Sequence, residues 1–304
     1  MEPSVQEEQR SPRARGVAGG GWTAELNLEL ALRADCTRVT KVSHVGPLRI
    51  QRPFYPEADG TSHLIILHPP GGVVGGDELK LSSVLHEGAH GLVTTPAATK
   101  IYRTLGPSSQ LSQEFLVGPG ALLEWLPQET IAFSGAKADI RTKVRLADGA
   151  RFIGWELLCL GRPAAGETFE RGRLVQRLEL WQGERPLYLD RLDLCADAPV
   201  LEAKWGLLAH PVVATMILAG GPSSLSPLIR ECLGQLSGNP SDDLGPGIAE
   251  PALRLSASDL EGATVVRYVG PSVPECWNAF IAIWQVVRPL FSGTVATLPR
   301  IWNT

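Results

Sequence analysis

The sequence lacks most of the features by which a catalytic or membrane protein is recognised. No uninterrupted apolar stretch approaches about 18 residues, so no transmembrane helix is expected. There is no CxxC pair among the five cysteines, no GxSxG elbow, and no glycine loop of the GxGxxG or Gly-Lys-Ser/Thr type. The sequence therefore carries no signal for a paired-cysteine metal site, a serine hydrolase or a nucleotide-binding enzyme.

Clustered basic charge is also missing. The chain has 28 Lys and Arg against 32 Asp and Glu, a net charge of -4, with no Lys/Arg run, so neither nucleic acid nor a membrane is an expected partner. Residues 1–20 are polar and lack the apolar core of a signal peptide, and we expect a disordered tail there. We expect residues 21–304 to form a single domain of a cytoplasmic protein, with reduced and mostly buried thiols.

Alternating apolar and polar residues recur through more than half of the chain. Residues 25–33 (ELNLELALR) and 140–146 (IRTKVRL) show the alternation that is typical of half-buried strands. Residue pairs containing Gly lie between such segments and predict two-residue hairpin turns, so sequential strands would mostly be antiparallel neighbours. These pairs are Asp59-Gly60, Glu87-Gly88, Asp148-Gly149, Gly183-Glu184 and Glu261-Gly262.

Helical patterns appear only late in the sequence. One helix is predicted to begin at Ser226-Pro227, an N-cap and first-turn pair. A second is predicted after Ser272, which has capping-box spacing to Glu275, and its wide apolar stripe should end before Pro289. Residues 237–251, rich in Gly, Pro and Asp, are expected to form a flexible loop between the two helices.

The most unusual local sequence is HPPGGVVGGDEL at residues 68–79, after the mostly apolar run Ser62–Leu67, which predicts a strand buried on both faces. Glycine accepts positive φ and proline fixes φ, so a sharply folded structural loop is predicted whose main chain approaches another segment closely. The loop glycines are Gly71, Gly72, Gly75 and Gly76, and Asp77 closes the loop with a charge. Residues 94–103, with Lys100 and Arg103, could pair with Asp77 or form a docking surface.

The segment His86-Glu87-Gly88-Ala89-His90 matches the zinc metalloprotease pattern HExxH letter by letter. The motif works when both histidines lie on one face of a helix, with the glutamate beside the metal-bound water. Glycines within and beside this segment, and the strand pattern before it, argue against a helix. We predict a turn between two strands, with the histidines pointing apart.

Glu156 and Asp190 lie on predicted apolar strand faces. Glu156 shares its face with Phe152 and Leu158, and Asp190 shares its face with apolar residues of LYLDRLDL. A carboxylate in such a place must be paired, hydrogen-bonded or hydrated, because bare burial costs several kcal/mol. Two interpretations remain open: a structural pairing with an arginine such as Arg162 or Arg191, or a polar path through the core.

Six separated blocks in order resemble the UreD family of urease accessory proteins, called UreH in some organisms, from about residue 21 to the C-terminus. The blocks are HVGPLRIQRPFYPE from His44, HPPGGVVGGDEL from His68, TTPAATKIYR from Thr94, LEWLPQE from Leu123, GWELLCLGRPAAGETF from Gly154 and LPRIW from Leu298. With the strand patterns, the resemblance predicts a mostly β fold, an elongated β-helix-like stack of short strands with two α-helices in the C-terminal region.

The resemblance also implies a function. It implies a non-enzymatic scaffold that binds apo-urease, recruits the accessory proteins UreF and UreG, and assists nickel delivery through an internal passage. We expect no tightly bound cofactor and no stable metal site, only nickel in transit. Carboxylates, carbonyls and water bind such a cation weakly enough to release it, and Asp77, Glu156 and Asp190 are the candidates to line the passage. The alternatives are a zinc-dependent hydrolase using residues 86–90, or a purely structural adaptor.

Overall fold

The computed structural model describes residues 21–237 and 255–303. The tail expected at residues 1–20, and all but the first residue of the loop expected at 237–251, lie outside the described residues. The strands are β1 (Thr23–Arg33), β2 (Cys36–Val45), β3 (Arg49–Ile50), β4 (Ser62–Leu67), β5 (Glu78–Leu85), β6 (His90–Thr94), β7 (Thr99–Ile101), β8 (Ser109–Val117), β9 (Leu122–Leu126), β10 (Thr130–Ala132), β11 (Ala136–Leu146), β12 (Arg151–Leu160), β13 (Gly172–Gln182), β14 (Arg185–Cys195), β15 (Val212–Ala219), β16 (Leu255–Leu260) and β17 (Ala263–Gly270). The helices are α1 (Ser226–Ser237) and α2 (Val273–Ser292), with 3-10 turns at Pro163–Ala165 (η1), Pro199–Leu201 (η2) and Arg300–Asn303 (η3).

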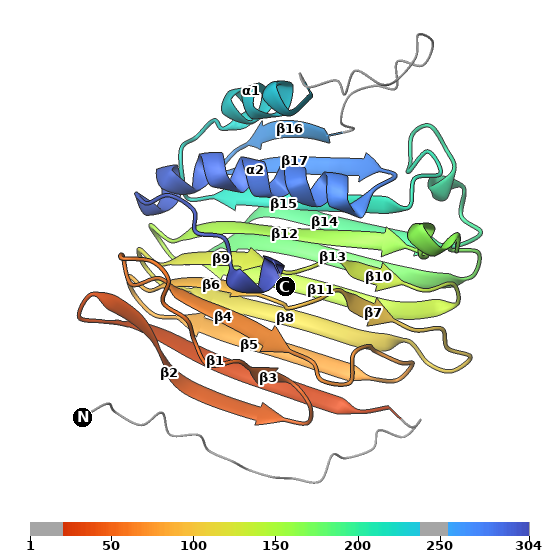
Figure 1. Ribbon diagram of the computed structural model, residues 1–304, viewed down its shortest axis with the longest axis horizontal. Coiled ribbons are helices and arrows are strands. Elements are labelled where there is room, and N and C mark those ends of the chain that lie inside the picture. Colours follow the sequence, from red (N-terminus) through yellow and green to blue (C-terminus); the bar gives the residue numbers. More distant parts are fainter. Residues whose placement is uncertain (1–20, 238–254, 304) are drawn as a thin grey trace.

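Two sheets lie face to face and are stacked from β2 at one end to β16 at the other (Figure 1). The first sheet has the order β14-β13-β11-β8-β5-β1-β2, and the second has the order β16-β17-β15-β12-β9-β6-β4-β3. The chain passes back and forth between the sheets, so that neighbours such as β5, β8 and β11 are parallel although each is separated in sequence by strands of the other sheet. This β-solenoid-like stack confirms the predicted mostly β fold.

The prediction that sequential strands are mostly antiparallel neighbours is wrong for the middle of the chain. Glu87-Gly88 and Asp148-Gly149 lead from a strand of the first sheet to a strand of the second, and Asp59-Gly60 ends a longer loop. Only Gly183-Glu184 and Glu261-Gly262, among the pairs considered, join hairpin strands. A glycine with positive φ allows either turn, and here burying apolar faces between two sheets favours the corner over the hairpin.

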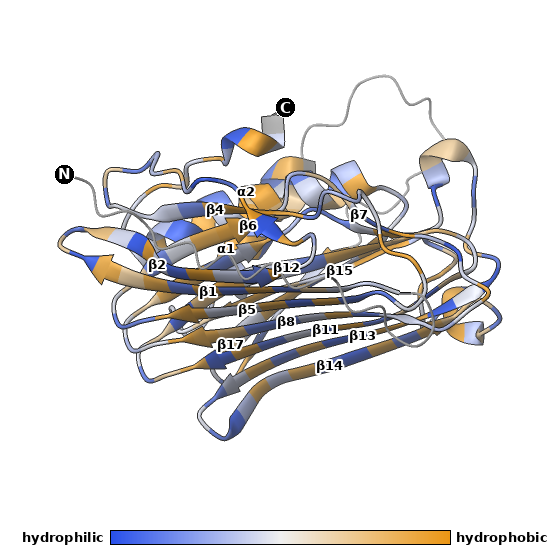
Figure 2. Cartoon of the chain, turned by 90° about the horizontal axis from the view of Figure 1, so that it is seen from below, coloured by the Kyte–Doolittle hydropathy of each residue, from blue (hydrophilic) through white to orange (hydrophobic). Residues whose placement is uncertain are grey.

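The apolar residues are buried in two layers on either side of the second sheet. One layer fills the space between the sheets, and the other lies between the second sheet and the two α-helices. The first sheet has a solvent-facing side, so its strands alternate in hydropathy (Figure 2). Strands β9 and β15 of the second sheet are buried on both sides throughout, and so is β4 except at Leu67, which confirms the prediction for Ser62–Leu67.

Both predicted helices form, and α2 covers the outer face of the second sheet (Figure 1). Ser272 caps α2 by accepting a hydrogen bond from the Glu275 N–H at 3.3 Å. The predicted end before Pro289 is wrong, because the helix continues to Ser292. Pro289 removes one donor, but buried Phe291 and Arg288 anchor the last turn. None of the helices in the described part of the chain combines the length and apolar character needed to cross a bilayer.

Candidate functional site between the two sheets

The second sheet is interrupted where two neighbouring strands break. Strand β6 ends at Thr94 and the chain resumes as β7, while β9 ends at Leu126 and resumes as β10. Each break contains a proline, Pro96 or Pro127, which cannot donate a ladder hydrogen bond. Because β6 pairs with β9 and β7 pairs with β10, the breaks lie side by side. They border a cavity of about 220 Å³ that extends into the space between the sheets.

The cavity has an apolar interior with a few polar groups. Its inner wall comes from the first sheet and includes Leu111, Gln113 and Ile140. Glu156 of β12 contributes a carboxyl group from the second sheet. The residues at the breaks and the glycine loop that border it are His68, Gly71, Gly72, Lys100, Gln128 and Thr130. A concave, mostly apolar site with a few convergent polar groups is the usual form of a binding site.

Glu156 is half-buried and faces inward, as predicted, because Phe152 and Leu158 on the same face of β12 belong to the layer between the sheets. Its carboxyl accepts hydrogen bonds from the Thr142 hydroxyl and from Gln176 Nε2, the latter at 2.6 Å. Burial raises the pKa of Glu156, and these neutral donors offset the rise only in part. In the described part of the chain no Lys or Arg forms an ion pair with Glu156.

Asp190 is brought to the same region of the core as Glu156. Both carboxyl groups line a second cavity of about 10 Å³, roughly the space for one water molecule, together with Gln176 and Thr215. Asp190 accepts a hydrogen bond from the Tyr188 hydroxyl at 2.9 Å, and its Oδ2 lies 3.6 Å from Arg267 Nη2. The polar groups thus continue from the larger cavity across the core to the exposed side of Arg267.

The structural pairing with an arginine that the sequence left open forms for Asp190, but its partner is Arg267 and neither Arg162 nor Arg191. Arg162 instead pairs with Glu167, and Arg191 pairs with Asp193 at 2.9 Å. Period-2 geometry shows which way a side chain points, but it does not identify the residue opposite on another sheet.

The glycine loop is sharply folded and closely approached, as predicted. Gly71 and Gly76 have φ of +74° and +88°. A Cβ on Gly72 would lie 2.2 Å from the Tyr102 ring, and one on Gly75 would lie 2.1 Å from Thr104 Oγ1. The loop therefore fits against the segment that follows β7 only because these positions lack side chains.

Asp77 is placed differently from the other two candidates. Its oxygens accept hydrogen bonds at 2.9 Å from the backbone N–H groups of Trp22 and Val74, and it is not among the residues that line either cavity. His68, at the other end of the loop, lines the larger cavity. Burial lowers the pKa of His68 and the nearby Asp77 charge offsets this only in part, so its imidazole is a neutral potential ligand at neutral pH.

The HExxH segment is a turn followed by a strand, as predicted. His86 Nε2 lies 3.2 Å from Glu29 on β1, whereas His90 Nε2 lies 2.7 Å from Glu124 on β9 of the other sheet. The two imidazoles therefore contact partners on different sheets. Among residues 21–237 and 255–303 no three His, Cys, Asp or Glu side chains form a group that could hold a metal ion.

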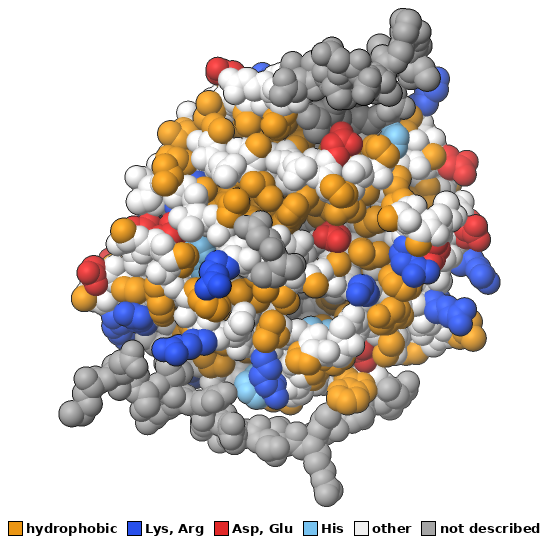
Figure 3. Space-filling model, in the orientation of Figure 1, with side chains coloured by type: hydrophobic (Ala, Val, Ile, Leu, Met, Phe, Trp, Pro, Cys, Tyr) orange, Lys and Arg blue, Asp and Glu red, His pale blue; other side chains and the backbone are white. Residues whose placement is uncertain are grey.

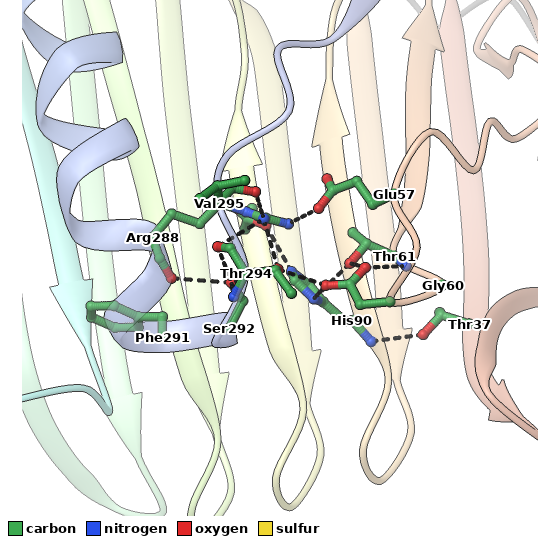
Figure 4. Close-up of polar contacts among 12 residues, drawn as sticks. Thr37, Glu57, Gly60, Thr61, His90, Arg288, Phe291, Ser292, Thr294 and Val295 are labelled. Carbon is green, nitrogen blue, oxygen red and sulfur yellow. Dashed lines mark hydrogen bonds and ion pairs between the residues drawn. The ribbon is translucent and has the colours of Figure 1, made fainter.

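A buried charge network under the end of α2 was not anticipated. We call it the Arg288 network; its members are Glu57, His63, His90, Glu124 and Arg288. Figure 4 shows Glu57, His90 and Arg288 of this network. Arg288 and Glu124 are both 0% exposed. Arg288 Nε lies 3.1 Å from Glu124 Oε1, and Arg288 Nη2 lies 2.6 Å from Glu57 Oε2. The other oxygen of Glu57, Oε1, lies 2.6 Å from His63 Nε2. The network joins α2, β4, β6, β9 and the loop before β4.

Electrostatics in this network differ from those at Glu156. Burial alone would raise the pKa of Glu124, but the hydrogen bond and charge of His90 and the charge of Arg288 lower it. Trp284 Nε1 donates a further hydrogen bond to Glu124 at 2.6 Å. Arg288 Nη1 also donates to the Val295 carbonyl at 2.6 Å, which ties the segment after α2 to the same centre. The charged groups of this network are therefore paired with one another.

A sequence signal for this network existed. Glu124 is the one charged residue in the run LLEWL, and Arg288 follows Trp284 by four positions on the apolar stripe of α2. A charged residue at a position that the period assigns to the core requires a buried partner. The signal shows that partners exist, but the pairing across 164 residues cannot be read from it.

Comparison with known proteins gives one consistent family. Residues 23–303 match the model of the UreD urease accessory protein family. A urease accessory protein UreD 2 of Brucella anthropi is 42% identical over 286 residues, covering 93% of this chain and 99% of the relative. Urease accessory proteins UreD of Saccharophagus degradans and Klebsiella pneumoniae are 40% and 39% identical, each covering 93% of this chain and 93% and 96% of the relative.

Proposed function

Because the chain belongs to the UreD family of urease accessory proteins, which act in urease maturation, we propose that it is a scaffold that binds apo-urease, UreF and UreG and passes nickel to the urease active site through its interior. The observation that carries this proposal is the cavity of about 220 Å³ that begins at the paired strand breaks and holds Glu156.

The ligands along this route suit a cation that must leave again. The route begins at neutral His68, continues to Glu156 among the neutral donors Thr142 and Gln176, and reaches Asp190. Oxygen ligands without a closed Cys/His cage bind nickel weakly, so the ion moves between sites instead of resting. The ion gives Glu156 the counter-charge that the described protein groups do not supply.

Asp77 acts indirectly in this proposal. Both of its oxygens accept backbone N–H groups, so it holds the glycine loop in place, and its charge acts on His68 at the cavity. Its substitution would change the loop and the imidazole together, which makes Glu156 and Asp190 the more informative residues to test.

The test measures urease nickel content and complex yield in parallel for variants of the two carboxylates. Glu156→Ala and Asp190→Ala remove a weak ligand and let apolar neighbours close the space. Glu156→Gln and Asp190→Asn keep volume but remove the charge. We expect nickel content to fall most with Ala and less with the amides, while complexes with urease, UreF and UreG persist, because these side chains point inward.

Glu114→Ala is the matched control, because Glu114 follows Gln113 on β8 but is exposed on the opposite face of the strand. It should leave nickel content unchanged. Parallel loss of nickel and complex in the Glu156 and Asp190 variants would contradict the passage and favour a structural role for the carboxylates. Full nickel delivery in every variant would instead favour the alternative that the protein is a structural adaptor without a metal path.

A further inference from the structure

A separate concave site lies at the ends of β7 and β10, beside the larger of the two internal cavities. It has a volume of about 990 Å³, and we call it the cationic cleft. The side chains that define it are Tyr102, Arg103, Phe133, Lys137, Arg162 and Arg171. Figure 3 shows basic side chains gathering at the end of the molecule where β7 and β10 lie.

The strand register brings these basic residues together. Arg103 forms a bridge with Ala136, the residue before Lys137, at the start of β11. Ala136 in turn is in register with Gly172, the residue after Arg171, at the start of β13. Three separate segments therefore contribute a cation at one level of the stack, although no basic run exists in the sequence.

Most of this positive charge is not neutralised. Arg162 pairs with Glu167 and stacks 4.6 Å above the centre of the Phe133 ring. In the described part of the chain, the side chains of Arg103, Lys137 and Arg171 form no hydrogen bond or ion pair. Four cations and one carboxylate give the cleft a charge of +3, in a chain whose net charge is -4. Clustered like charges repel, so an anionic occupant would be attracted.

The cleft also offers apolar contact. The Tyr102 and Phe133 rings meet edge to face with centroids 5.0 Å apart. Leu105, which also lines the cleft, is fully exposed to solvent. Aromatic residues and arginine are enriched at the centres of protein interfaces, and an exposed leucine beside them favours a peptide side chain over a simple inorganic anion.

The surroundings limit the length of an anionic occupant. A neighbouring cavity of about 1000 Å³ shares Glu167 and is lined by Glu170, Asp197 and Glu202. A long polyanion such as nucleic acid would extend from positive into negative surroundings, which is unfavourable. A short acidic segment avoids this repulsion.

We propose that the cationic cleft binds a short acidic segment, with an apolar residue within it, of a protein partner in the urease maturation assembly. This inference rests on the proposed function for the identity of the assembly, whereas the chemistry of recognition rests on the cleft alone. The Tyr102 ring packs against Gly72, which borders the internal cavity, so the bound segment would hold the partner beside the entrance of the passage.

The first test uses the full-length chain and a fluorescein-labelled peptide of eight residues, glutamates with one central leucine, followed by fluorescence anisotropy at increasing salt. We expect saturable binding that weakens as salt rises. Arg103→Ala, Lys137→Ala and Arg171→Ala combined should weaken binding about tenfold. The control combines Arg33→Ala, Arg52→Ala and Arg145→Ala, which remove the same charge from exposed positions outside the cleft and should change binding less than about twofold.

Equal weakening in the two triple variants would overturn the proposal, because it would show a general charge effect. Absence of saturable peptide binding, or tighter binding of single-stranded oligo-dT than of the peptide to the same cleft, would also overturn it. In a second measurement the cleft variant should lower complex yield with at least one of apo-urease, UreF and UreG. That readout does not depend on nickel, so failure of the passage in the Glu156 variants is distinguishable from failure of the cleft.

Discussion

Glu124 and Glu156 lie on adjacent strands of one sheet and point to opposite sides of it. Glu124, on β9, faces α2 and meets His90, Trp284 and Arg288. Glu156, on β12, faces the other sheet and, among the residues that the structure describes, meets only neutral donors beside a cavity. Burial acts on both carboxyl groups, yet the pKa of Glu124 is lowered and that of Glu156 is raised.

The difference shows how one sheet separates a structural charge from an available one. A carboxylate neutralised by Arg288 could take a metal ion only if the arginine gave way, at the cost of a buried uncompensated charge. Glu156 has no such competitor among the described residues, and it borders open space. The side with α2 thus carries a neutralised carboxylate, whereas the side between the sheets carries the Glu156 carboxyl group with no Lys or Arg partner in the described part of the chain.

The largest effect should come from removing the shared cation of the Arg288 network. Arg288→Met keeps most of the side-chain volume but removes the guanidinium that the buried carboxylates of Glu57 and Glu124 share. We expect a loss of about 3–5 kcal/mol in the free energy of unfolding, measured by urea denaturation at neutral pH. Arg300→Met, at an exposed position in η3, is the control and should change stability by less than about 0.5 kcal/mol.

A smaller loss should follow from Glu124→Gln, and its pH dependence sharpens the comparison. The lowered pKa of Glu124 means that its contribution to stability is present above its unfolded pKa and is lost as pH falls through the folded value. At neutral pH we expect Glu124→Gln to cost about 2 kcal/mol, with the difference from the parent shrinking below about pH 4.5. A difference that stays constant from pH 7 to pH 3 would contradict the assigned charge state.

Glu156→Gln should act in the opposite direction. Its raised pKa means that folding is favoured where the carboxyl is protonated in both states, and that stability is lost as pH rises through the raised folded value. The amide of Gln does not ionise and so removes this loss. We therefore expect the free energy of unfolding to rise by up to about 1 kcal/mol at pH 8 and to change little at pH 4. Thermal melts at the two pH values measure it, and clear destabilisation at pH 8 would show that Glu156 is a structural anion like Glu124.

The smallest effect is expected for His86→Ala. His86 is exposed, and its contact with Glu29 competes with Lys41, which lies 3.1 Å from the same carboxylate. Exposed ion pairs contribute little, so the melting temperature and urease activation should be nearly unchanged. Loss of stoichiometric zinc together with activation in this variant would instead revive the metalloprotease interpretation of residues 86–90.

The sequence predicted the local features of the fold better than its pairings. Alternation identified β1 and β11, and the capping box located α2, because both signals lie within a few residues. The corner at Glu87-Gly88 was interpreted as a hairpin, since the turn residues are compatible with both and only packing of the second sheet decides. The stacked arrangement itself followed from resemblance to a family, not from periodicity.

The candidate site shows the same limit. Period-2 spacing correctly predicted that Glu156 and Asp190 point toward the core, and both residues line the small cavity. Their partners Thr142, Gln176 and Arg267 come from other strands, so no local pattern could name them. The cavity depends on two strand breaks being adjacent in space, which is a property of the register between strands that are distant in the sequence.

The position of Arg288 in the chain matters during translation. The ribosome makes the loop that carries Glu57 and the strand that carries Glu124 first, and Arg288 follows Glu124 by 164 residues. A nascent chain can stack its early strands. Water cannot be excluded from the surface that holds the two carboxylates, however, until α2 has been synthesised. In a product of premature termination before Arg288, that surface would stay hydrated and locally open. Proteases that recognise unfolded backbone would then degrade the truncated chain.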